Sequence, residues 1–195
     1  MAKGSGDVIL RDRLQFTLDA TGSLSTVYGR MDLSQYTGGN KGLAIKEVRY
    51  QLRDPGTGNG VFSIVGDNTN TSGATATRCS YKLFATTRAY ENAADVGIAS
   101  PDVLCVEEGQ WVLGTVDAGL SPEPSWAQWD RHWFGPEDLH PAGFTVVTDL
   151  LVGIAFDNWD IQENQTLELD VLLVADPVTV TETRMRALLA QAQDL

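Results

Sequence analysis

The sequence predicts an all-β protein, an antiparallel β-sandwich of about eight strands followed by a short C-terminal helix. Two segments near the C-terminus carry alternating apolar residues, and turn signals recur at fairly regular intervals along the rest of the chain. Alternation with period two indicates β-strands, because successive side chains of a strand point to opposite faces of the sheet. Short strands with regular turns are typical of sandwiches and barrels. The apolar residues of the two segments are Phe144, Val146, Leu150, Val152, Ile154 and Phe156, and then Leu167, Leu169, Val171, Leu173 and Ala175.

Further strands are expected earlier in the chain. A strand pattern begins at Val8, a second candidate covers 24–33, and 43–53 is a clear strand whose parity switches at Lys46-Glu47. Such a switch predicts a β-bulge, because one extra residue flips the set that faces the core. Segment 61–65 reads as a short strand and 78–86 alternates again. Segments 103–106 and 111–116 are expected to form a hairpin across Glu107-Glu108-Gly109.

The run 181–193 predicts the one helix of the chain, with Met185, Leu188, Leu189 and Ala192 at helical spacing. A helix of about 13 residues is marginal alone, so its apolar stripe must pack on something. Either the stripe packs on its own sandwich, or Met185, Leu188 and Leu189 form a subunit interface. The expected organisation is therefore an N-terminal arm (1–7), a sandwich domain (8–180) and the amphipathic helix (181–195).

Composition excludes several classes of partner. The net charge is −12, with only four lysines against ten arginines. Nucleic-acid binding draws on clustered basic residues, so no direct nucleic-acid binding is expected. The apolar run 150–156 is far too short to cross a bilayer, so no membrane insertion is expected. Cys79 and Cys105 match no metal motif and are expected to be two small buried thiols.

The stretch 117–143 is interpreted as the longest irregular segment, and a loop of this length inside a domain is usually functional. It carries the candidate ligand-binding residues Trp126, Trp129, His132 and Trp133. The three tryptophans could stack on sugar rings, or they could pin the loop onto the sandwich while the polar residues face water.

Metal binding and catalysis have weaker signals. His132 and His140 with Glu137 and Asp138 could bind a metal, but their spacing matches no zinc or cupin motif. The oxygen-rich loop with Asp157, Asn158, Asp160 and Glu163 suits either calcium or a solvated turn, and the EF-hand spacing is absent. No nucleophile elbow, P-loop or dinucleotide fingerprint is present. We therefore expect no cofactor, no metal and no enzymatic activity.

The whole layout, with a short arm, about eight strands between Val8 and Val180, long loops and a terminal extension, resembles the single jelly-roll capsid proteins of icosahedral viruses. The resemblance is architectural, since lectin-like and cupin domains share the pattern. It implies a jelly-roll sandwich and a self-assembling shell subunit in the virion, whose partners are copies of itself and other capsid proteins. The family often has a basic arm, whereas this arm carries only Lys3 before Arg11 and Arg13. The low lysine content suits the acidic members found in viruses of salt-loving archaea.

Two alternatives remain beside the shell subunit. The first is a carbohydrate-binding β-sandwich that uses Trp126, Trp129 and Trp133. The second is a cupin-like metalloenzyme that uses His132 and His140.

Overall fold

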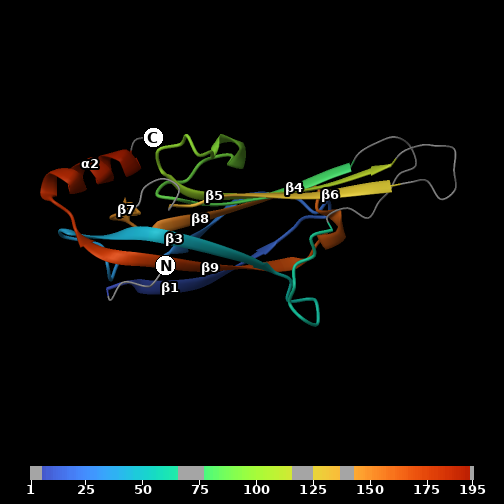
Figure 1. Cartoon of the computed structure of the whole chain (residues 1–195), viewed down its shortest axis with the longest axis horizontal. Coiled ribbons are helices and arrows are strands. Elements are labelled where there is room, and N and C mark those ends of the chain that lie inside the picture. The colour runs from blue at the N-terminus through green and yellow to red at the C-terminus, as the bar shows by residue number, and fades with distance from the viewer. Residues whose placement is uncertain (1–5, 66–76, 116–124, 137–142, 194–195) are drawn as a thin grey trace.

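The computed structural model of the chain describes residues 6–65, 77–115, 125–136 and 143–193. Within these ranges nine strands form two antiparallel sheets that lie face to face as two layers (Figure 1). Strands make up 56% of the structure and helix 10%. The strand fraction is well above the roughly 20–25% of an average globular domain. The all-β sandwich predicted from the sequence is confirmed.

The two sheets divide the strands by position in the chain. The four-stranded sheet has the order β1-β9-β3-β7, made of β1 (Val8–Thr17), β9 (Thr166–Thr179), β3 (Lys41–Arg53) and β7 (Phe144–Val146). The five-stranded sheet has the order β2-β8-β4-β5-β6, made of β2 (Leu24–Met31), β8 (Leu150–Asp157), β4 (Thr77–Thr86), β5 (Val103–Thr115) and β6 (Ser125–Phe134). Two short 3-10 helices, η1 (Ala93–Asp95) and η2 (Asp160–Gln162), lie in connections, and α2 (Glu182–Gln193) follows the last strand.

The strand pairs are nested along the chain. β1 pairs with β9, β2 with β8, β3 with β7 and β4 with β5, each of them antiparallel. The chain passes from one sheet to the other at every step from β1 to β4, and β6 adds to the far edge of β5 outside the nesting.

The core lies between the layers, where the alternating residues of both sheets meet. Ile154, Phe156, Leu169 and Val171 are all at most 5% exposed, which confirms the parity predicted for β8 and β9. Phe156 stacks on Phe16 with ring centroids 5.4 Å apart. These contacts remove most of the apolar surface of both strands from water, which is the main favourable contribution to folding.

The predicted bulge in β3 is confirmed, since the register against β9 shifts between Ile45 and Glu47. The extra residue is Lys46, and its ammonium group binds Asp7 at 2.8 Å and Asp176 at 2.5 Å. These two carboxylates raise the pKa of Lys46, with the hydrogen bond to Asp176 the larger cause. The ion pairs also attach the residues before β1 to the sandwich.

Besides the strand β6, which lies where a loop was expected, three details of the strand assignment were wrong. β5 runs without interruption through Glu107-Glu108-Gly109, so there is no hairpin at that point. Segment 61–65 is not a strand and contributes only an isolated bridge between Arg53 and Val61. The apolar segment that begins at Phe144 is divided between the sheets, because the chain crosses from β7 to β8 between Val146 and Leu150.

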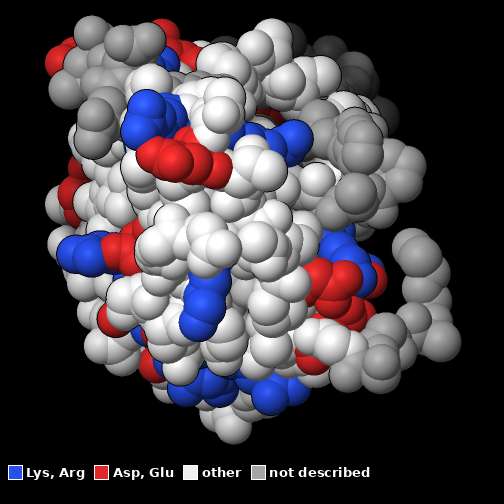
Figure 2. Space-filling view, turned by 90° about the vertical axis from the view of Figure 1, so that its left-hand side faces the viewer, with Lys and Arg blue, Asp and Glu red and all other residues white. Residues whose placement is uncertain are grey.

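Helix α2 begins where the sequence predicts it. The Thr181 hydroxyl accepts a hydrogen bond from the Arg184 amide at 3.4 Å, which satisfies one of the free amides at the helix start. The helix lies at one end of the sandwich (Figure 1). On that end of the molecule acidic and basic residues adjoin one another between wide uncharged areas (Figure 2). Among the described residues no helix is long and apolar enough to cross a membrane.

Candidate functional site

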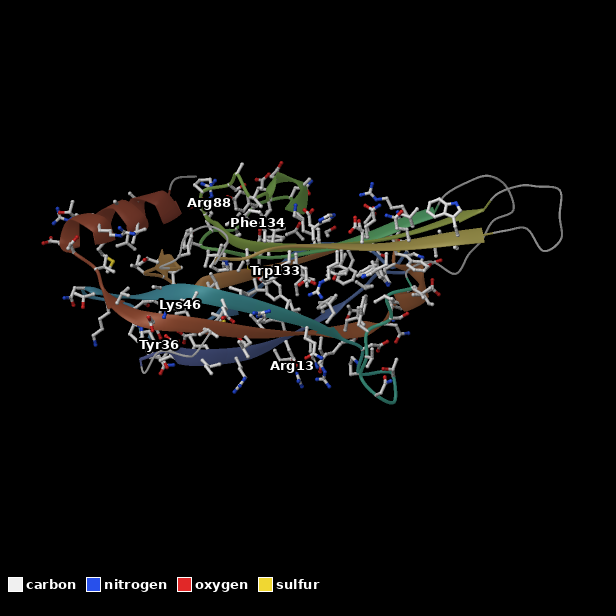
Figure 3. All side chains as sticks on the ribbon, viewed as in Figure 1. Arg13, Tyr36, Lys46, Arg88, Trp133 and Phe134 are labelled. Atoms are coloured by element: carbon white, nitrogen blue, oxygen red, sulfur yellow. The ribbon has the colours of Figure 1, made fainter. Side chains whose placement is uncertain are left out.

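The four candidate residues of the predicted loop lie on strand β6, not in an irregular segment. β6 pairs with β5 over ten residues, from Ser125 opposite Thr115 to Phe134 opposite Val106. The alternation of a strand therefore sends these side chains to opposite faces of the sheet. Trp126 and His132 lie on the outer face, whereas Trp129 and Trp133 pack against the core. Figure 3 shows Trp133 between the two layers and its neighbour Phe134 directed away from them.

The inner face of β6 is part of the aromatic core. The Trp129 ring lies 6.0 Å from the Tyr81 ring and 6.1 Å from the Trp159 ring. The Trp133 ring meets the Tyr50 ring edge-on at 5.8 Å. Both indoles are therefore held by packing between the sheets, and they do not form a platform with Trp126.

Between these two tryptophans the buried carboxylate of Glu107 meets the half-exposed guanidinium of Arg131 at the inner face. The carboxylate of Glu107 on β5 accepts hydrogen bonds from the Tyr81 hydroxyl at 2.9 Å and from the Arg131 guanidinium at 2.8 Å. The hydrogen bond to Glu107 raises the pKa of Arg131. Burial raises the pKa of Tyr81, and the nearby Glu107 charge adds to the effect. Sequence reasoning missed this pair, although the parity of β4, β5 and β6 would have placed all three residues on one face.

A small hollow of about 300 Å³ adjoins the charged pair at the edge of the sandwich. It is lined by one residue pair from β3 and three residues from the other sheet: Arg49, Tyr50, Glu107, Arg131 and Trp133. The Tyr50 hydroxyl lies 3.2 Å from the Cys105 sulfur, and burial raises the pKa of this phenol. Cys79 and Cys105 are both buried, as expected from the sequence.

The outer face of β6 presents polar groups and the exposed ring of Trp126. The Trp126 side chain is 46% exposed and lies across Gly114, where a Cβ atom would come within 2.3 Å of the indole. The His132 ring nitrogen Nε2 lies 3.1 Å from the Asp130 carboxylate. Asp130 and His132, but not Trp126, line an open depression of about 560 Å³. Its polar lining includes Lys82, Glu108, Gln110, Asp130, His132 and Asp157.

The metal hypotheses gain no support from the described residues. Within them no group of three or more His, Cys, Asp or Glu side chains could hold a metal ion. His140, Glu137 and Asp138 lie outside the described residues, so only His132 of the proposed histidine pair is placed. The acidic residues of segment 157–163 belong to the turn around η2, where Asn158 has a positive φ of 56°.

The apolar stripe of α2 packs on its own sandwich. Met185 is 8% exposed and contacts a cluster with Val147 and Val180, and Leu188 and Leu189 are half-buried at its margin. Whether the half-buried leucines also meet a neighbouring subunit stays a prediction.

The sequence matches no protein-family model and no curated protein. Among solved structures, the chain is similar to one from Desmodium yellow mottle tymovirus at 10% identity and a TM-score of 0.25, over 93% of this chain and 88% of that one. It is also similar to the tailspike protein of Acinetobacter baumannii phage AM24 at 9% identity and a TM-score of 0.20, over 90% of this chain and 27% of that one. Both scores are too low to identify a family or to carry a functional argument.

Proposed function

We propose that this chain is a structural protein, the self-assembling shell subunit of a virus particle, built as a jelly-roll sandwich. The observation that carries the proposal is the nested strand pairing. In a jelly roll the chain folds as one long antiparallel ribbon rolled into two sheets, so the first strand pairs with the last and the second with the last but one. The pairs β1–β9, β2–β8, β3–β7 and β4–β5 follow this order, with β6 as an added edge strand.

A shell subunit needs several separate contact surfaces, because closed symmetry requires each surface to meet a complementary one. The described residues offer three such places: the free edge of β6, the half-buried flank of α2, and an end of the sandwich with exposed apolar side chains. At that end Val61 and Ile64 are 62% and 50% exposed and Ile161 is 37% exposed. The rings of Phe62 and Trp159, 5.3 Å apart, join the two segments that carry them.

In this proposal the partners are copies of the chain and other capsid proteins, the location is the virion, and the chain has no enzymatic activity and no cofactor. The net charge of −12 agrees with contacts to protein and not to a nucleic acid or a membrane.

Particle size tests the proposal directly. We expect the purified chain to form closed particles of uniform diameter in negative-stain images, with a native mass many times 21.1 kDa. A chain that stays monomeric from about 0.1 M to about 1 M salt at high protein concentration would contradict the proposal.

A carbohydrate-binding module is the second candidate, and one observation favours it. Trp126 is exposed on the outer face of β6, the same face that carries Asp130 and His132 at the 560 Å³ depression. Flat aromatic rings with adjacent hydrogen-bonding groups suit sugar recognition. We expect Trp126→Ala to abolish binding on a glycan array if this function is right, whereas Trp129→Ala serves as the matched inner-face variant and lowers stability instead. Wild-type protein that binds no glycan would remove this candidate.

A further inference from the structure

Strand β6 is a long edge strand whose charged residues Asp130 and Arg131 each have a partner within the same chain. Within the described residues it pairs only with β5, so the outer edge of a ten-residue strand is free. Edge strands of soluble proteins are normally kept short, bulged, or supplied with Pro, Lys or an uncompensated charge, because free N–H and C=O groups pair readily with another strand. β7 is three residues long and β2 has a register shift. β6, with the sequence SWAQWDRHWF, has no proline, no lysine and no glycine.

The centre of β6 is complementary to itself when read in the opposite direction. Its central five residues read Trp129-Asp130-Arg131-His132-Trp133. A tryptophan stands at each end, with a carboxylate before the central Arg131 and an imidazole after it. In an antiparallel pair of two identical strands centred on Arg131, each Asp130 faces the His132 of the other copy. We propose that β6 pairs edge to edge with β6 of a second copy of this chain, around a twofold axis at Arg131, to form a continuous ten-stranded sheet.

The outer face of this contact is electrostatically matched. In one copy Asp130 and His132 are already neighbours at 3.1 Å, with side chains 51% and 74% exposed. Strand pairing adds a second opposite partner to each group, so the two copies form an alternating set of two carboxylates and two imidazoles. A hydrogen-bond donor directly opposite an acceptor stabilises an antiparallel strand pair, whereas two like charges directly opposite each other destabilise it.

On the inner face the twofold axis places the Arg131 side chains of the two copies opposite each other, which alone would cause repulsion between like charges. Each Arg131 binds the carboxylate of its own Glu107 at 2.8 Å, so the charge on the axis is compensated within each chain. On either side of the axis Trp133 faces Trp129 of the second copy. The hollow of about 300 Å³ beside Trp133 provides space at this edge for the facing indoles to pack.

This inference names one contact of the assembly proposed above and rests on that proposal only for the step from dimer to closed particle. The two can fail separately. A β6-linked dimer that forms no larger particle supports the contact and contradicts the shell function. Closed particles that do not depend on β6 contradict the contact and leave the shell function standing.

Charge exchange tests the contact in the full-length chain. His132→Asp places four carboxylates at the contact, and we expect it to raise the dimer dissociation constant about tenfold in sedimentation equilibrium. Adding Asp130→Lys to the same chain restores opposite charges across the axis and should return the dissociation constant to near the wild-type value. Both positions are solvent-exposed, so far-UV dichroism and melting temperature should be unchanged. An equal dissociation constant in all three proteins would overturn the inference.

A disulfide test fixes the register. With the axis at Arg131, Gln128 of one copy faces Phe134 of the other, at a Cα separation of about 4.5–5.5 Å that a disulfide can bridge. Gln128→Cys/Phe134→Cys should form covalent dimers on mild oxidation, whereas the matched variant Gln128→Cys/His132→Cys should not. Because positions 128 and 134 are six residues apart along one extended strand, they cannot bond within one chain. No covalent dimer in the first variant, or equal amounts in both, would contradict the proposed register.

Discussion

The Tyr81 hydroxyl donates a hydrogen bond of 2.9 Å to the Glu107 carboxylate in the space between the two sheets. Glu107 is 3% exposed, and its other oxygen accepts from Arg131. A buried carboxylate is tolerated only where hydrogen bonds and an opposite charge replace its lost hydration. The buried Glu107 carboxylate on β5 therefore links β4 and β6, through its hydrogen bonds with Tyr81 and Arg131.

We predict that Tyr81→Phe lowers the free energy of unfolding by about 1.5–3 kcal/mol, the usual contribution of a hydrogen bond to a charged group. The substitution keeps the ring contacts with Phe156 and Trp129 and removes only the hydroxyl. Urea denaturation of both proteins measures the difference. Tyr36→Phe is the control, since the hydroxyl of this half-buried residue makes no hydrogen bond to the part of the chain that the structure describes, and it should change stability by less than about 0.5 kcal/mol.

The turn between β1 and β2 gives a prediction of pH dependence. The Asp19 carboxylate accepts hydrogen bonds from the Ser23 amide, the Thr21 hydroxyl and the Thr21 amide, and these bonds lower its pKa below the usual value. A lowered folded-state pKa means that the carboxylate stabilises the fold above its unfolded pKa of about 3.9 and that this stabilisation is lost as the pH falls through the folded value.

Asp19→Ala should therefore lower the melting temperature at pH 7, and the difference from wild type should shrink as the pH falls below about 4. Differential scanning calorimetry between neutral and acidic pH measures it. Asp19→Asn keeps an acceptor oxygen without a titrating group, so it should lie between the two at pH 7. A difference that stays constant down to pH 2 would show that the charge of Asp19 has no part in the turn.

Period-two patterns were enough to predict β8, β9, the bulge in β3 and the burial of Ile154 and Leu169, because one face of each strand packs on the core and the other meets water or polar groups. The same alternation is present in segment 125–134, but the prolines on both sides of it indicate a loop. Along β6 the odd-numbered Trp129 and Trp133 share the inner face, and the even-numbered Trp126 and His132 share the outer one. The candidate ligand cluster therefore separates into two sets on opposite faces.

The prediction of a turn within β5 was wrong for a different reason. Glu107-Glu108-Gly109 has the composition of a turn, but each residue has a partner that sequence alone does not reveal. Glu107 faces Tyr81 and Arg131, and Glu108 binds Lys82 at 2.9 Å on the outer face. Gly109 lies under the Tyr81 ring, where a Cβ atom would come within 2.3 Å of the ring. Tertiary contacts across three strands thus override the local turn preference.

The centre of the core gives a prediction for packing. Phe156 is 5% exposed, and its ring lies 5.4 Å from Phe16 and 5.7 Å from Tyr81. Phe156→Ala should lower the free energy of unfolding by about 3–5 kcal/mol, because the surrounding rings cannot close the cavity. Ile161→Ala, at an exposed position of the η2 turn, is the control and should cost less than about 0.5 kcal/mol. A small loss for Phe156→Ala would mean that the ring cluster repacks freely.

Helix α2 allows folding and assembly to be separated. Met185 is buried against Val147 and Val180, so Met185→Ser should lower the melting temperature of the folded chain. Leu188 and Leu189 are only half-buried, so changing both to Ser should affect stability less. If these two leucines also contact a neighbouring subunit, the double variant should reduce the fraction of assembled protein more than it reduces strand content. Light scattering and far-UV dichroism on the same samples distinguish the two effects. A double variant that assembles like wild type would restrict the stripe to its own sandwich.

Assembly should depend on salt in a direction set by the net charge. Copies of a chain with a charge of −12 repel one another, and salt limits this repulsion to about 10 Å at 0.1 M and about 3 Å at 1 M. The contacts proposed at β6 and α2 lie within the shorter distance, so their local ion pairs and apolar packing persist while the long-range repulsion is removed. We therefore expect the native mass to rise and particles to form as salt increases, and the particles to dissociate on dialysis to low salt.

Replacing sodium chloride by an equal concentration of a neutral osmolyte is the control, because it leaves the repulsion unscreened and should not promote assembly. Assembly that weakens steadily as salt rises would show instead that attraction between opposite charges, and not apolar contact and strand pairing, holds the copies together.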